Sequence, residues 1–166
     1  LKLLGLIKKK ALMIKINIIC NSNIWFKYIK NPNNYLQNKI NNLNKNYKKY
    51  KNKNIYCTLL LSESKEIKRL NKKFRKKNKT TDVLSFPFHE KKELKKVMKK
   101  DREIYLGDIV ININKIKKKN NKKYFNLSFN KLWIHGLTHL FGHDHKKNND
   151  YYKMYKIEKK ILTCIN

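Results

Sequence analysis

The sequence predicts an α+β fold in which helices pack on a small mixed sheet of four strands. Short apolar stretches with strand character alternate with amphipathic stretches along the 166 residues, in the order βαβαββαα. This length is the size of one ordinary domain, and 40% apolar residues suffice for its core. Met13 directly precedes the first strand-like stretch. We therefore expect one domain over residues 13–166, with residues 1–12 an extension outside the folded unit.

Four stretches have strand character. In the first, Ile14, Ile16 and Ile18 alternate with polar residues, which predicts one buried face. The second is continuously apolar, which indicates burial on both faces. The third closes at Pro87, since proline cannot donate to a sheet ladder, and Gly107 is a candidate bulge position in the fourth. The predicted strands are residues 13–20, 55–61, 81–88 and 104–114.

The helices are predicted from apolar residues repeated every three or four positions. Pro32 stands near the start of the first helix, and Ser62 precedes the acidic first turn of the second. We expect a solvated loop or frayed helix over residues 89–103 and a lysine-rich connection over 115–125. The helical ranges are 32–50, 63–74, from 126 or 128 to about 141, and 150–165.

Charge is the most extreme feature of the composition. The chain carries 42 Lys and Arg against 11 Asp and Glu, a formal net charge of +31. Such a charge attracts nucleic acid or acidic lipid. However, Lys, Asn and Ile, the residues of A/T-rich codons, make up 82 of the 166 residues, while Arg, which grips phosphate bidentately, occurs 3 times. The charge therefore permits a nucleic-acid partner without demonstrating one.

The cysteines and the apolar runs indicate the compartment. Cys20, Cys57 and Cys164 are far apart, which fits buried thiols in a reducing compartment better than a disulfide framework. No apolar run approaches the roughly 18 residues of a spanning helix, and no cleavage site follows a hydrophobic stretch. We expect a soluble cytoplasmic protein with no membrane partner.

Four of the five histidines lie within residues 135–145. His135 and His139 are four residues apart and share one helical face. Gly142 is expected to end the helix at positive φ, so that His145 returns toward them. The bulky apolar residues fall on the opposite side of the helix: Phe129, Trp133, Leu137 and Leu140.

This HxxxHxxGxxH spacing is that of the metzincin zinc proteases, so we expect a metzincin-like zinc helix. Three imidazoles with an open fourth position are typical of a catalytic zinc. The sequence predicts one Zn²⁺ held by His135, His139 and His145, with a plain polar histidine patch as the alternative. The proteases carry Glu after the first ligand as general base, and Gly136 stands in that place. A metalloprotease is therefore the least favoured function.

The segment HGLTHLFGHDH, residues 135–145, resembles the signature HGxLHLxGYDH of the YbeY family, zinc-dependent endoribonucleases of ribosomal RNA maturation. LNKKFRKKNKTTDVLSFPF, residues 70–88, and LGDIVI, residues 106–111, are similar to the family's other two blocks in the same order. The resemblance covers about residues 13–165 and implies that His135, His139 and His145 are the zinc ligands. Thr138 replaces the family's usual Leu, and His143, which replaces its Tyr, is a competing candidate ligand.

The resemblance implies a single-strand-specific, zinc-dependent endoribonuclease in ribosomal RNA processing. Its expected roles are maturation of the 3′ end of 16S ribosomal RNA and ribosome quality control. The expected partners are a ribosomal RNA precursor and the small ribosomal subunit or its proteins, with no DNA. A ribosome-assembly binding protein with a structural zinc is the alternative from a different class.

Further residues are candidates for the chemistry. Arg75 lies in a block that resembles the family's FR/YR element and is the predicted phosphate clamp, with an exposed helix-end arginine as the alternative. His135 contributes through the zinc site, since a bound zinc can activate water or polarise a phosphoryl oxygen. Asp108 is a weaker candidate, either an acceptor behind a ligand, a group at the substrate edge or a turn-stabilising residue. Ser85 is expected to be a packed strand residue and His89 a solvated one.

Overall fold

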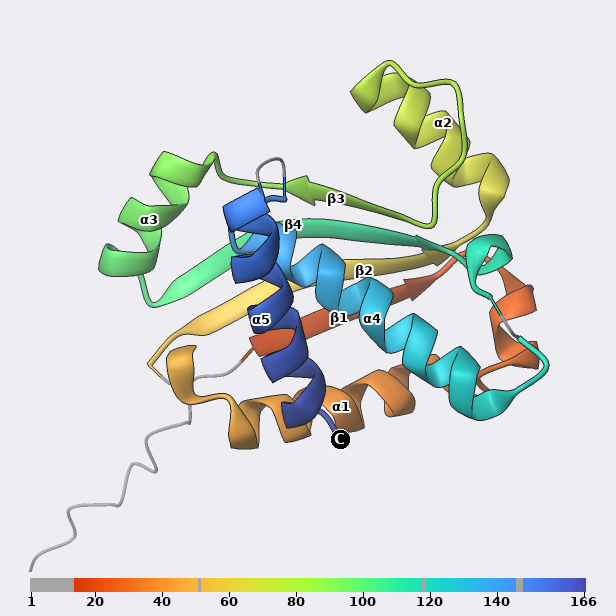
Figure 1. Ribbon diagram of the computed structural model, residues 1–166, viewed down its shortest axis with the longest axis horizontal. Coiled ribbons are helices and arrows are strands. Elements are labelled where there is room, and N and C mark those ends of the chain that lie inside the picture. The colour runs from red at the N-terminus through yellow and green to blue at the C-terminus, as the bar shows by residue number, and fades with distance from the viewer. Residues whose placement is uncertain (1–13, 51, 118, 146–147) are drawn as a thin grey trace, which may run out of the picture.

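A computed structural model describes residues 14–50, 52–117, 119–145 and 148–166 (Figure 1). Its sheet has the strand order β1-β2-β4-β3, with β1, β2 and β4 parallel and β3 antiparallel to β4. The strands are β1 (Ile14–Cys20), β2 (Asn54–Ser62), β3 (Val83–Pro87) and β4 (Glu103–Asn112). The predicted mixed four-stranded sheet is confirmed. The expected extension, residues 1–12, lies outside the described residues.

Helices cover the two faces of this sheet unequally. Helices α1, α4 and α5 lie on one face and enclose the main core, and α2 packs on the other face beside β3 and β4 (Figure 1). The helices are α1 (Pro32–Asn46), α2 (Ser64–Arg75), α3 (Lys91–Lys100), α4 (Lys122–Leu140) and α5 (Asn148–Cys164). Single 3-10 turns are η1 (Asn23–Lys27), η2 (Lys48–Tyr50) and η3 (Ile113–Lys115).

Two helix starts differ from the sequence prediction. Helix α4 begins at Lys122 instead of 126 or 128, because the Asn121 side chain caps it and accepts a hydrogen bond from the Tyr124 backbone N–H at 3.2 Å. The expected cap of α2, Ser62, is instead the last residue of β2, and Glu63 occupies the cap position. In the lysine-rich segment 89–103, α3 forms around the buried Leu94.

The second strand is less buried than its apolar sequence indicated. Ile55, Cys57, Leu59 and Leu61 face the main core and are buried, whereas Tyr56, Thr58 and Leu60 lie on the opposite face and are only partly covered. The reason is that α2 packs mainly against β3 and β4, at one end of that face. Part of the sheet on the α2 side therefore remains open.

Gly107 forms the predicted bulge in β4. Its φ is +127°, and between Tyr56 and Thr58 of β2 the partner residue on β4 moves from Tyr105 to Asp108. A Cβ at Gly107 would lie 2.1 Å from the Phe86 carbonyl oxygen, so only glycine fits. The extra residue turns Asp108 toward the α2 face and Ile109 toward the core beneath α4.

Two observations relate to the expected cytoplasmic compartment: the state of the cysteines and the apolar character of the helices. Cys20, Cys57 and Cys164 are free thiols, and burial raises the pKa of Cys57 to about 12. Within the described ranges, no helix combines the length and apolar character needed to cross a membrane.

Candidate metal centre

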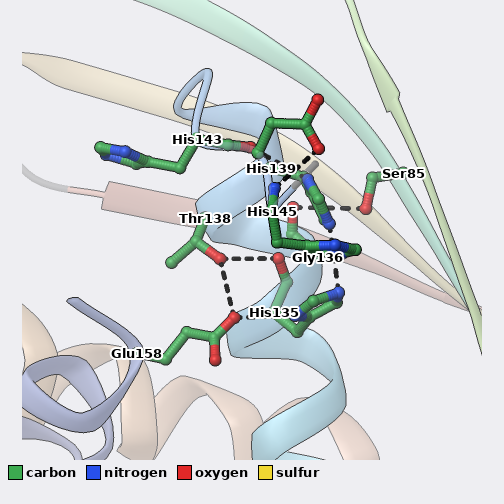
Figure 2. Close-up of polar contacts among 9 residues, drawn as sticks. Ser85, His135, Gly136, Thr138, His139, His143, His145 and Glu158 are labelled. Carbon is green, nitrogen blue, oxygen red and sulfur yellow. Dashed lines mark hydrogen bonds and ion pairs between the residues drawn. The ribbon is translucent and has the colours of Figure 1, made fainter. Parts of the chain in front are cut away.

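Three histidines converge where α4 ends (Figure 2). His135 and His139 lie on its last turns, while the apolar face predicted for this helix is buried against the sheet. Gly142 has φ +79°, as predicted, and the chain turns there so that His145 reaches the other two rings. One ring nitrogen from each histidine lies within 4.8 Å of the others. The cluster could hold one metal ion.

The rings of His135 and His139 are oriented by hydrogen bonds on their far sides. His135 Nδ1 lies 2.7 Å from Glu158 Oε1 of α5, and His139 Nδ1 lies 3.0 Å from the His143 carbonyl oxygen. Their Nε2 atoms face each other at 3.1 Å. Acceptors at both Nδ1 atoms favour the tautomer whose Nε2 is free to bind a metal. The donor set and its orientation therefore fit a divalent ion.

Burial also favours the metal-binding form of His139. Loss of solvent lowers the pKa of its imidazole, and the neighbouring His135 lowers it further, although the hydrogen bond to the His143 carbonyl opposes this. A lowered pKa keeps the ring neutral at neutral pH. Neutral imidazole is the form that binds a metal ion.

His143 does not join the cluster. Figure 2 shows its ring directed away from the other three. The residue lines a separate cavity of about 410 Å³, together with Lys49 and Lys91. Burial and these two lysines lower the pKa of His143. Its contribution to the centre is the backbone carbonyl that holds His139. Of the two competing imidazoles, His145 is the one beside His135 and His139.

Thr138, the departure from the family signature, packs behind His135. Its side chain is buried, and its hydroxyl lies 2.8 Å from the His135 carbonyl oxygen and 3.3 Å from Glu158 Oε1. A leucine there would offer no polar contact to this carboxylate. Sequence reasoning missed Glu158, because it lies 23 residues from His135 on another helix. The sequence offered one indication of its importance, since Glu158 is one of only 11 acidic residues in the chain.

Gly136 lets α4 lie close to the sheet. A Cβ at this position would be 2.6 Å from Ile109 Cγ2, and the Ser85 hydroxyl donates to the Gly136 carbonyl oxygen at 3.3 Å. The side chain of residue 136 would therefore enter the core. A carboxylate here has neither space nor access to the histidine cluster.

Arg75, at the end of α2, is connected to α4 through Ser85 of β3. Its Nη2 donates to the Ser85 carbonyl oxygen at 3.1 Å, so Ser85 bonds both Arg75 and the residue after His135. Ser85 itself is buried, in agreement with the prediction of a packed strand residue. His89, expected to be solvated, instead has its Nδ1 buried 3.4 Å from Glu93.

Asp108 lies away from the histidines. It accepts a hydrogen bond from the Tyr105 hydroxyl at 2.5 Å, and Tyr105 also contacts Thr58. Asp108 and Arg75 line a cavity of about 870 Å³ on the α2 face of the sheet. The structure thus places the Arg75 guanidinium at the backbone of β3, the edge strand of the sheet. Asp108 lies on the sheet face opposite α4.

Known proteins have sequences similar to that of this chain. A family model described as "Endoribonuclease YbeY" matches residues 21–166. The chain belongs to the YbeY family. The "Endoribonuclease YbeY" of Pelagibacter ubique is 44% identical over 155 residues, which cover 92% of this chain and 97% of that protein. That of Wolbachia is 35% identical over 65 residues, covering 38% of this chain and 43% of that protein.

A solved structure supports the fold of this YbeY-family chain. The solution structure of TM1509 from Thermotoga maritima superimposes with a TM-score of 0.54 at 22% sequence identity. The match covers 91% of this chain and 89% of that one. At this identity the likeness establishes the fold alone.

We expect Glu158→Ala to weaken binding of a divalent metal ion about 10- to 100-fold, because His135 then loses the acceptor that orients its ring. Glu158→Gln, which keeps an oxygen acceptor, should fall between Ala and the parent. Competition against a chromophoric chelator measures the affinity. Glu93→Ala is the matched control, since Glu93 stands 3.4 Å from His89 outside the cluster. Unchanged affinity in Glu158→Ala would contradict the orienting role.

Proposed function

We propose that this protein is a single-strand-specific, zinc-dependent endoribonuclease that processes ribosomal RNA. The observation that carries the proposal is the convergence of His135, His139 and His145, with two of the rings held at Nδ1. The endoribonuclease names of its relatives support RNA as the substrate class. A bound zinc would supply Lewis acidity toward water or a phosphoryl oxygen.

The number of ligands favours a catalytic over a structural metal. A structural zinc is usually closed by four ligands, often with cysteine. Among the described residues, the metal-ligating group contains three histidines and no cysteine. His145 is exposed and the other two histidines are partly buried, so a metal ion held by the three rings would be accessible to water and substrate. A ribosome-assembly protein with a structural zinc fits this open site less well.

Arg75 is our proposed phosphate clamp. A guanidinium has five N–H donors, and the bond from Nη2 to the Ser85 carbonyl orients it while leaving others for a phosphate. Ser85 in turn bonds the residue that follows His135, which couples the position of the clamp to that of the metal site. Asp108 remains a secondary candidate at the substrate edge, on the α2 side of the strand.

The substrate we propose is a ribosomal RNA precursor, with cleavage at the 3′ end of 16S ribosomal RNA and a role in ribosome quality control. The small ribosomal subunit or its proteins are the proposed partners, and DNA is not one. The net charge of +31 supports a nucleic-acid partner, and three free thiols support the cytoplasm as the compartment. Proteolysis is disfavoured because the position after His135 has no room for a base.

Removal of the metal tests this proposal. Zinc-loaded protein should cut a single-stranded RNA, and chelation should slow cutting at least about a hundredfold, since the Lewis acid supplies several kcal/mol. Added zinc should restore the rate. The measurement is the initial cleavage rate, with RNA binding followed in parallel by fluorescence anisotropy. A zinc-loaded protein that binds the RNA without cutting it would instead support the ribosome-assembly alternative.

A further inference from the structure

A second feature adjoins the metal centre, namely a cavity of about 550 Å³ between α4, α5 and the start of β3. His135 lines it, so the cavity opens beside the histidine cluster. Much of its wall is apolar: Val83, Leu132, Ile134 and Leu162. Cavities of roughly 300–1,000 Å³ with mostly apolar walls and a few polar groups bind small organic ligands. This volume suits a single nucleotide.

Tyr155 gives the cavity an aromatic surface. Its side chain lines the cavity and is 51% exposed, so the ring is accessible to a ligand. The ring is held parallel to that of Tyr151, with 6.4 Å between centroids and 10° between planes. Nucleic-acid bases stack on such rings without regard to base identity. Tyr155 is therefore suited to the flat face of an unpaired base.

The charges of the cavity favour an anionic ligand. Lys131 and Lys159 line it, and within the described residues neither ammonium group lies within 4.0 Å of a carboxylate. The two acidic residues of the wall are already engaged. Asp82 accepts from the Val83 backbone N–H at 2.9 Å, and Glu158 contacts His135 at 2.7 Å. The lysines are thus the charges available to a phosphate.

We propose that this cavity binds the nucleotide adjacent to the scissile phosphate of a single-stranded RNA. The base stacks on Tyr155 against the apolar wall, and Lys131 and Lys159 bind its phosphate. The inference rests on the proposed function, since His135 belongs to both the cavity and the metal centre. A base held in a duplex cannot offer its face to a side chain, so the cavity would also select single strands.

Substitutions on α5 test the proposal. Tyr155→Ala should raise KM for a single-stranded oligoribonucleotide about 5- to 100-fold, as expected for loss of one stacked base. Its kcat should stay within about twofold, because the group contributes to binding and not to the chemical step. Lys159→Ala should lower the slope of log Kd against log salt by about one. Metal content should remain that of the parent in both variants.

Matched controls lie on the same helix. Tyr152→Ala removes a 62% exposed ring, and Lys156→Ala removes an exposed lysine; neither residue lines the cavity. Both should leave KM unchanged at roughly 0.2 M salt, where non-specific attraction by the lysine surface is weak. A KM for Tyr155→Ala within twofold of the parent, or an equal rise in Tyr152→Ala, would overturn the proposal.

The same variants separate this inference from the proposed function. Binding of the oligoribonucleotide is also measured by anisotropy in the presence of a chelator, where cleavage is not required. If the parent does not cut RNA, the proposed function fails, yet weaker binding by Tyr155→Ala than by Tyr152→Ala would still support the nucleotide cavity. If the parent cuts RNA and the two variants bind equally, only the cavity assignment fails.

Discussion

His139→Ala is expected to abolish stoichiometric metal binding and to lower RNA cleavage at least about a hundredfold. The physical reason is that His139 Nε2, 3.1 Å from His135 Nε2, is one of the three ring nitrogens proposed to bind the metal, and two imidazoles do not retain a metal ion as three do. Metal per chain is measured by mass spectrometry, and cleavage by initial rates. Circular dichroism should show that the variant remains folded, because the His139 side chain is only partly buried.

His143→Ala is the matched control for this prediction. It removes an imidazole four residues after His139 in the sequence. That ring lies beside Lys49 and Lys91, outside the cluster. The His143 carbonyl that holds His139 is unchanged by this substitution. Metal content and cleavage rate should therefore match those of the parent. Loss of the metal in His143→Ala, with retention in His145→Ala, would show that the third ligand is His143.

Gly136→Glu, which restores the protease sequence HExxH, is expected to lower the free energy of unfolding by at least about 3 kcal/mol. The new Cβ would lie 2.6 Å from Ile109 Cγ2, and a β-branched side chain cannot rotate that methyl group away freely. The carboxylate would also be carried into an apolar core. Urea unfolding followed by circular dichroism measures the loss. No proteolytic activity should appear.

A double-mutant cycle isolates the steric part of this effect. Gly136→Ala improves helix propensity by about 1 kcal/mol, so a stabilised variant is expected if packing is indifferent. The contact with Ile109 predicts net destabilisation instead, and this should diminish in an Ile109→Ala background. Stabilisation by Gly136→Ala in the parent background would contradict the close approach of α4 to the sheet.

Much of the fold could be predicted from the spacing of apolar residues and from the glycines that mark turns and bulges. Alternation in residues 14–18 predicted β1, and the three- and four-residue spacing predicted α1 and α5. Gly142 has the positive φ that its position indicated, and Gly107 lies at the bulge predicted there. The predicted start of α4, at residue 126 or 128, was wrong because the first turn of the helix is lysine-rich and has no apolar pattern. Only the cap at Asn121 marks that start.

The sequence by itself determined the spacing of the proposed metal ligands, since His135 and His139 are brought together by one helix and His145 by the turn at Gly142. Local geometry suffices for such contacts. The tertiary structure alone decided which residues support them: Glu158 arrives from α5, Ser85 connects Arg75 to α4, and His143 turns away. These contacts depend on how helices pack on the sheet, and no periodicity within one segment encodes that packing.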